Sequence, residues 1–236
     1  MCFLMGVISA QIKADILFEA RWGGQFTLSA TETGEKMTIS AIASDENYIY
    51  LYDMSDRSII RIDSLGAIIS RIRLESIGRA TYVGDDFIIK DNQAIFLNAV
   101  DFRLEYFDCT GGTHLKSIAY PSDALKNPKR SKSIINRIFL DGNTIILGNI
   151  YAVFPFNENE KLQKSKIISF PKDKKILFYH SRKAVEEISG QTFWNNKKIG
   201  LKRPVFHFSG KHIVLYKNTL LQCIVDNTGI HLYQIR

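Results

Sequence analysis

Four aspartates at the ends of apolar stretches are the residues of this sequence best suited to hold a metal ion. They are Asp53, Asp91, Asp101 and Asp141. Carboxylates arranged around a channel are ligands that a divalent cation such as calcium accepts. Aspartate is equally common in tight turns, where its side chain bonds the backbone. The pattern therefore allows a cation site or a set of turns, and both interpretations stay open.

The histidines form only one close pair in the sequence. His207 and His212 flank a Ser-Gly turn and could share one face at the end of a hairpin. A metal site would still need a third ligand, so two structural or surface histidines are the favoured interpretation. The other three, His114, His180 and His231, occur singly inside strand patterns without an evident partner.

Basic residues gather in segments that lie between the predicted strands. The candidate rim consists of Lys126, Lys129, Arg130, Lys132, Lys197, Lys198, Lys202 and Arg203. Such a rim would contact phosphates and bind nucleic acid in a salt-dependent way. Trp194 and Tyr120 lie near these segments in the sequence and could stack on bases. The alternative is that loop lysines serve solubility alone, and that no nucleic acid binds.

Short catalytic motifs are missing from the chain. It contains no GxSxG, HExxH, GxGxxG, P-loop or EF-hand pattern. Its cysteines, Cys2, Cys109 and Cys223, are odd in number, far apart and without a CxxC pair, so neither a zinc site nor a disulfide framework is indicated. Cys109 and Cys223 could pair only if the fold brought them together. An enzyme would have to assemble its site from separate segments.

A repeated unit of strands must position all these residues. Two copies, Tyr48–Ile72 and Ala94–Ile118, each read as a strand, a polar break, a second strand, a turn and a third strand. Asp108 and Gly111 stand where Asp63 and Gly66 stood, at an offset of about 45 residues, which falls in the range of β-propeller repeats. The Asp-x-x-Gly element predicts a tight turn between the third and fourth strands of a blade.

Three further units are less regular. One starts at Thr144 after the Asp141-Gly142-Asn143 hairpin signal, and another runs from His212 to Ile235 with Asp226 and Gly229 restored. Between them, the stretches from Lys174 and from Gln191 predict two strands of a weak unit. The link from Lys183 to Ile188 could form a short helical turn capped by Ser181.

The repeat decides the predicted fold class. Each strand alternates apolar and polar residues, so each small sheet has faces that need covering, and radial stacking of the sheets covers them. A β-sandwich would show strands without the longer period, and a helical fold would show a 3.6-residue period. The sequence therefore predicts an all-β protein, a β-propeller of five to six blades, with a sandwich as the alternative.

The segment from Ile16 to Ile72 resembles the NHL-repeat type of six-bladed β-propeller. The features of that family fall on Trp22-Gly23, Ile42-Ala43, Asp45 to Tyr50, Arg61-Ile62-Asp63 and Gly66. The resemblance implies how a blade folds and carries no activity with it. Related lactonase-like propellers hold a catalytic calcium with carboxylates and an asparagine, of which this chain offers no full set. Some NHL-type propellers bind RNA on a basic rim.

Five units are visible where this resemblance implies six. Residues 12 to 30 are left over, and an N-terminal strand from them could complete the blade formed by Ile230 to Ile235. Otherwise the propeller is incomplete, and its open edges would favour an oligomer.

Composition places the chain among ordinary globular proteins. It has 236 residues, with 31 Lys and Arg against 24 Asp and Glu, and a formal charge of +7. We expect one propeller domain over residues 12–236. Residues 1–11 begin with an apolar stretch ending in small residues, which resembles part of a secretory signal, and no apolar run is long enough for a transmembrane helix. An exported protein, periplasmic or extracellular, is the preferred prediction, and a cytoplasmic one is the alternative.

The function expected from these features is a non-catalytic binding module that recognises a protein, peptide or glycan and needs no cofactor. Two alternatives remain, a metal-assisted hydrolase with calcium in the central channel and an RNA binder using the basic rim.

Overall fold

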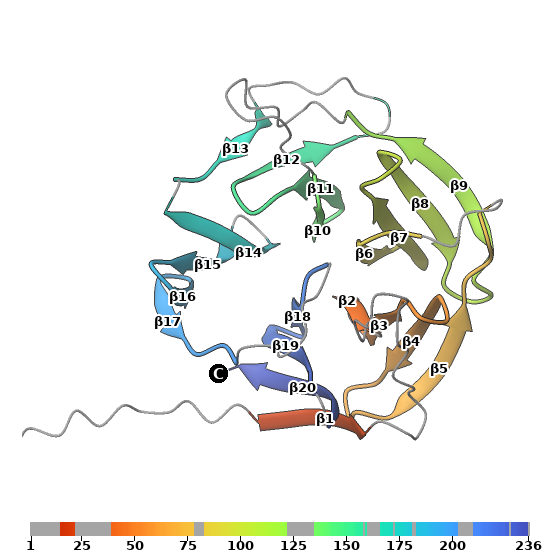
Figure 1. The fold of residues 1–236 in the computed structure, drawn as a ribbon, viewed down its shortest axis with the longest axis horizontal. Helices are drawn as coiled ribbons and strands as arrows, with labels where there is room; N and C mark the ends of the chain where they lie inside the picture. The colour runs from red at the N-terminus through yellow and green to blue at the C-terminus, as the bar shows by residue number, and fades with distance from the viewer. Residues whose placement is uncertain are drawn as a thin grey trace, which may run out of the picture.

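The computed structural model shows a ring of small sheets. It describes residues 15–21, 39–77, 83–121, 135–157, 159, 166–171, 173–180, 183–202, 210–226 and 228–235. Within these residues, twenty strands form five four-stranded antiparallel sheets arranged around a central axis (Figure 1). The protein is an all-β, five-bladed propeller, and the sandwich alternative is wrong.

Each blade is a meander that runs from the centre of the ring outward (Figure 1). Blade 1 consists of β2 (Ile39–Ser44), β3 (Ile49–Asp53), β4 (Ser58–Ile62) and β5 (Ile68–Arg73). Blade 2 consists of β6 (Asp86–Lys90), β7 (Gln93–Asn98), β8 (Arg103–Asp108) and β9 (His114–Ala119). Blade 3 consists of β10 (Arg137–Asp141), β11 (Thr144–Gly148), β12 (Ala152–Phe156) and β13 (Ile168–Ser169).

The remaining two blades complete the ring. Blade 4 consists of β14 (Lys174–His180), β15 (Lys183–Ile188), β16 (Gln191–Trp194) and β17 (Lys197–Ile199). Blade 5 consists of β18 (Ile213–Tyr216), β19 (Thr219–Val225), β20 (Gly229–Ile235) and the N-terminal strand β1 (Asp15–Arg21). Because neighbouring strands are antiparallel, the turns after the first and third strands of a blade lie at one end and the turn after the second at the other.

The core lies between the blades, as the strand patterns require. All five residues of the second strand β3 are buried, since both faces of this strand meet a neighbouring blade. The outer strand β5 instead shows the alternation expected when one face meets water. Between blades 1 and 2 the ring of Phe96 packs edge-on against Tyr52 at 4.7 Å and stacks on Phe87 at 5.0 Å. Contacts of this kind couple each blade to the next.

The predicted Asp-x-x-Gly turns are present in the first two blades. Asp63 Oδ1 accepts the N–H groups of Leu65 and Ala67, and Gly66 adopts a φ of +84°. In blade 2, Asp108 Oδ2 accepts the N–H of Gly111, but the positive φ of +77° falls on Gly112. Both turns join the third and fourth strands, as expected.

The ring is closed by the two ends of the described chain. Strand β1 pairs antiparallel with β20, with Glu19 opposite His231 and Arg21 opposite Gly229 (Figure 1). This confirms closure by an N-terminal strand. It also corrects the last repeat: its strands are the first, second and third of blade 5, so the turn from Asp226 to Gly229 joins the second and third strands. The strand expected before Gly210 lies outside the described residues.

Blade 4 corrects a second expectation. The stretch Lys183–Ile188 is strand β15, and the helical alternative is wrong. It pairs with β14 on one side and β16 on the other, with Val185 fully buried. Tertiary pairing therefore outweighs the helix propensity of Ala, Glu and Lys.

Three further expectations from the sequence concern the number of blades, the N-terminal residues and membrane-spanning helices. The described residues make five blades, so the six blades implied by the NHL resemblance are not confirmed. The signal-like residues 1–11 and the Trp22-Gly23 pair lie outside the described part of the chain. Within the part that is described, no helix has the length and apolar character needed to span a membrane.

Candidate functional site

A buried ion pair occupies the centre of the ring. Lys211 Nζ lies 3.0 Å from Asp86 Oδ1, and the two residues are 3% and 0% exposed. The ammonium also donates to the carbonyl of Phe87, while Asp86 Oδ2 accepts the N–H of Ile138 at 3.1 Å. These bonds join blades 2, 3 and 5 at one point. In Figure 1 the chain that leads into β18 reaches the middle of the ring.

The backbone around Lys211 is fixed to blade 1 as well. Gly210 N donates to Ser40 O at 2.9 Å, and Ile42 N donates to Lys211 O at 3.0 Å. A Cβ atom on Gly210 would lie 2.4 Å from Asp85 O, so only glycine fits. Burial lowers the pKa of Lys211 and the Asp86 carboxylate opposes this shift. The Lys211 ammonium already occupies the position beside the Asp86 carboxylate that a bound cation would need. We therefore assign this pair a structural role.

His212 follows the ion pair and is held in its neutral form. Burial, assisted by the Arg137 guanidinium, lowers the pKa of His212 to about 4, although Asp86 acts in the opposite direction. Its expected partner, His207, lies outside the described residues. The paired-histidine hypothesis therefore stays a prediction.

The four candidate metal-binding aspartates are not brought together. Asp91 and Asp141 stand at turns after first strands, whereas Asp53 and Asp101 stand at turns after second strands, at the other end of the ring. Asp53 is buried, accepts the hydroxyl of Ser55 at 2.6 Å and lies 3.4 Å from an Arg71 guanidinium nitrogen. The described residues contain no cluster of three or more potential metal ligands. Because the four aspartates do not share one location, a calcium site formed by them stays a prediction.

Each of the three single histidines has a partner that the sequence did not indicate. His180 Nδ1 lies 3.1 Å from the carbonyl of Leu140. His114 Nε2 lies 3.1 Å from Glu105 Oε2 and 3.3 Å from Ser117 Oγ, and Ser117 also donates to Glu105. Serine, histidine and glutamate are the components of a hydrolytic triad, but a triad places the acid and the nucleophile on different ring nitrogens. Here both contact Nε2, so Glu105 does not orient the imidazole through Nδ1 while Nε2 takes the proton of Ser117.

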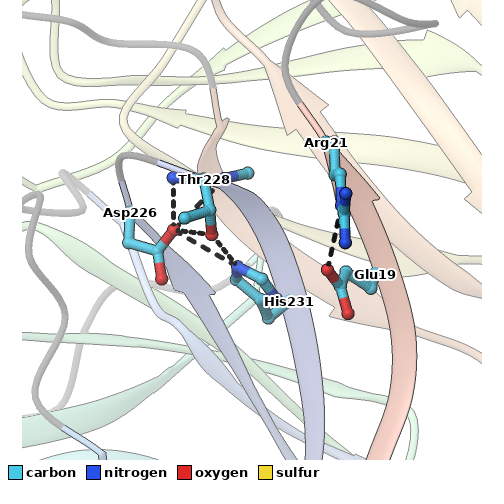
Figure 2. A network of polar contacts seen from close by, with 6 residues as sticks. Glu19, Arg21, Asp226, Thr228 and His231 are labelled. Atoms are coloured by element: carbon cyan, nitrogen blue, oxygen red, sulfur yellow. Dashed lines mark hydrogen bonds and ion pairs between the residues drawn. The ribbon is translucent and has the colours of Figure 1, made fainter.

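His231 belongs to a similar cluster at the start of β20, shown in Figure 2. Its Nε2 lies 3.0 Å from Thr228 Oγ1 and 3.2 Å from Asp226 Oδ1, and Thr228 Oγ1 donates to Asp226 at 2.6 Å. Although desolvation raises it, hydrogen bonds from Thr228, His231 and Gly229 hold the pKa of Asp226 at about 2. A separate pair, Glu19 and Arg21, lies on the adjoining strand β1 (Figure 2). The cluster fixes the turn between β19 and β20 and does not activate Thr228.

The predicted basic rim is described only in part. Lys197 and Lys198 are exposed within the outer strand β17, which corrects the expectation that they lie between strands, and Lys202 is exposed just after it. The other members, Lys126, Lys129, Arg130, Lys132 and Arg203, lie outside the described residues. Lys202 Nζ stands 3.6 Å from the centre of the Tyr233 ring.

The aromatic partners proposed for base stacking are packed into the fold. Tyr120 is 5% exposed, and Trp194 packs half-buried against Phe178 at 6.3 Å. The rim therefore presents lysines without these two rings, and its binding to RNA stays a prediction.

A cleft between blades 1 and 2 was not predicted from the sequence. It has a volume of about 300 Å³ and is lined by Arg61, Ser70, Arg71, Ile72, Arg73, Cys109, Thr110 and Gly111. The lining includes three arginines and no carboxylate. Arg61 was interpreted only as part of the repeat pattern. The signal that could have identified it is an arginine on the strand face that also carries the buried Ile59.

The cleft lining includes three side chains of nucleophilic type, Ser70, Cys109 and Thr110. Cys109 has the greatest intrinsic nucleophilicity of the three, but burial raises its pKa to about 12, helped by Asp108 and Asp45 and opposed by Arg61. A thiol with such a pKa stays protonated at neutral pH and is a poor nucleophile. Cys109 and Cys223 are both free and buried, so the two do not form a disulfide.

Comparison with known proteins adds little beyond the architecture. No protein-family model and no curated protein matches the chain. Glutaminyl cyclase from Myxococcus xanthus superposes with a TM-score of 0.44 at 11% identity, covering 83% of this chain and 71% of that one. BamB from Moraxella catarrhalis gives 0.42 at 10%, covering 85% and 84%. The Pan2 WD40 domain from Neurospora crassa gives 0.44 at 11%, covering 89% and 61%. Similarities this remote carry no argument about function.

Proposed function

We propose that this propeller is a non-catalytic binding module that recognises a protein, peptide or glycan through the cleft between blades 1 and 2. The observation that carries the proposal is the cleft itself, a hollow lined by arginines, a hydroxyl and a turn. Strands β4 and β5 and the turn after β8 form its walls. Ligand sites of proteins commonly combine a few polar side chains with loop residues held by a rigid scaffold.

The chemistry of the other polar clusters is consistent with a binding role. The Asp86–Lys211 pair stabilises the centre of the ring, and both serine- or threonine-containing clusters hold their acid and hydroxyl on the same imidazole nitrogen. The described clusters thus lack the arrangement of a hydrolytic triad, in which the acid and the nucleophile contact different nitrogens of the imidazole.

A cleft-filling variant tests the proposal. Thr110 lines the cleft and is exposed, so Thr110→Trp should block the hollow without disturbing the core. Thr113→Trp places the same side chain at another exposed position of this turn, outside the lining, and serves as the matched control.

The measurement is affinity capture from extracts and culture medium of the source cells with the three proteins. We expect a partner that the parent and Thr113→Trp retain and Thr110→Trp loses. A partner retained equally by all three would show that the cleft is not the contact. A captured ligand whose mass changes on incubation with the protein would overturn the non-catalytic assignment.

A further inference from the structure

Arg61 is placed and oriented by the fold in a way that requires an acceptor. It lies on β4 between Tyr50 of β3 and Ser70 of β5 in the strand register, on the face turned toward blade 2. Its guanidinium carbon stands 4.7 Å from the centre of the Tyr48 ring, which supports the flat side of the group. The edge of the guanidinium is therefore the part left for hydrogen bonds.

Two buried donors at this point have no hydrogen-bond partner among the described residues. They are Arg61 Nε and Ser70 Oγ, and both residues line the cleft. A buried polar group that lacks a partner destabilises the folded state, and a charged group does so more strongly. Arg61 and Ser70 are cross-strand partners, so a ligand oxygen that enters between the two side chains would supply the acceptor that both donors lack.

The neighbouring carboxylates are already engaged elsewhere. Asp45 accepts the N–H groups of Asn47 and Tyr48 and the hydroxyl of Tyr50. Asp108 accepts the N–H groups of Thr110 and Gly111, so these turn amides are not available to a ligand.

The arginines of the cleft differ in their ion pairs and in the direction of their side chains. Arg71 forms ion pairs with Asp56 at 2.5 Å and with Asp53 at 3.4 Å, which neutralises much of its charge. In the strand register Arg71 and Arg73 lie on the opposite face of β5 from Ser70 and Ile72, so Arg61 is the arginine whose side chain lies on the cleft face.

We infer that the cleft binds an oxyanion, a carboxylate or a phosphate group of the ligand, with Arg61 and Ser70 as its principal donors. This inference rests on the proposed function and names the chemical group that the module recognises. An arginine edge matches the paired oxygens of either group, and a charge-assisted hydrogen bond is about twice as strong as a neutral one.

Calorimetric titration with two probes tests the inference. Inorganic phosphate and D-glucuronate are added separately to the full chain at low ionic strength, in the millimolar range. We expect saturable binding of at least one probe, weakened about tenfold or more by Arg61→Gln and less strongly by Ser70→Ala. Arg61→Lys should also weaken it, since lysine keeps the charge but loses the planar donor edge. Arg103→Gln alters an exposed arginine of blade 2 outside the lining and should leave binding unchanged.

The outcomes distinguish a failure of the oxyanion inference from a failure of the proposed binding function. Circular dichroism and melting curves first establish that each variant is folded. Tighter phosphate binding assigns a phosphorylated group, and tighter glucuronate binding assigns a carboxylate. If neither probe binds, or if Arg61→Gln binds equally well, the oxyanion inference is overturned. A partner lost by Thr110→Trp would then still support the binding module, and Arg61-dependent anion binding without any captured partner would support the inference alone.

Discussion

Removing the ammonium from the centre of the ring should destabilise the whole propeller. Lys211→Met keeps most of the side-chain volume but leaves Asp86, a fully buried carboxylate, without its counterion. Removing one partner of a buried ion pair typically costs 3–5 kcal/mol. Asp86 would retain three backbone donors, Phe87 N at 3.0 Å, Lys211 N at 3.2 Å and Ile138 N at 3.1 Å. We therefore expect a loss near the lower bound, about 3 kcal/mol.

Urea unfolding followed by circular dichroism measures this loss. For a chain of this size 1 kcal/mol shifts the melting temperature by about 2–4 °C, so Lys211→Met should melt roughly 6–12 °C below the parent. A double-mutant cycle with Asp86→Asn isolates the pairing energy, which we expect to be about 2 kcal/mol.

An exposed ion pair provides the matched control. Lys175 Nζ lies 2.8 Å from Glu187 Oε1, a shorter distance than in the central pair, but the side chains are 46% and 33% exposed. The cycle for this pair should give less than about 1 kcal/mol, and salt should reduce it further. If Lys211→Met lost less than about 1 kcal/mol, or if both cycles gave equal energies, burial of the central pair would not be what stabilises the ring.

Three further predictions concern other parts of the ring. Acidification from pH 6.5 to 4 should reduce the free energy of unfolding by up to about 3 kcal/mol through His212, because the unfolded chain binds a proton that the folded protein, with a pKa of about 4 at this residue, does not. His212→Gln should show a correspondingly smaller loss in pH-dependent urea unfolding, and an equal loss would contradict the reasoning. Gly210→Ala should lower the melting temperature by several degrees, since its Cβ would lie 2.4 Å from Asp85 O and 2.6 Å from Ala41 Cβ; an unchanged temperature would mean that the backbone there adjusts freely. EDTA and calcium should leave the melting temperature unchanged, because the four candidate aspartates are divided between the two ends of the ring; a calcium-dependent rise would restore the metal hypothesis.

Local features of the fold could be predicted from the sequence. The turns at Asp63-to-Gly66 and Asp141-Gly142 follow from the backbone preferences of a few adjacent residues, and both are where the pattern placed them. The strand order in the last repeat could not be read in the same way. Every strand of a blade shows a similar alternation, so the pattern cannot tell a first strand from a second. Only the pairing of β1 with β20 fixes the order.

The candidate site was beyond prediction because its parts meet only through the fold. Lys211 and Asp86 are separated by 125 positions, and each alone resembles an ordinary loop residue. Arg61 and Thr110 come from neighbouring blades, and no spacing in the sequence joins them. What the sequence did contain was an arginine at a core-facing strand position, a pattern inconsistent with simple burial.

Closure of the ring by β1 has a consequence for how the protein is made. The strand that includes Phe18 is synthesised early, yet its partner β20 leaves the ribosome about 200 residues later. At roughly 5–20 residues per second, β1 waits on the order of 10–40 s for that partner. Blades 1 to 4 each contain all four of their strands in sequence and can fold during this interval, whereas blade 5 cannot. The nascent chain should therefore carry an unpaired strand until β20 has been synthesised, which makes this step the one most exposed to chaperones and to mispairing with another chain.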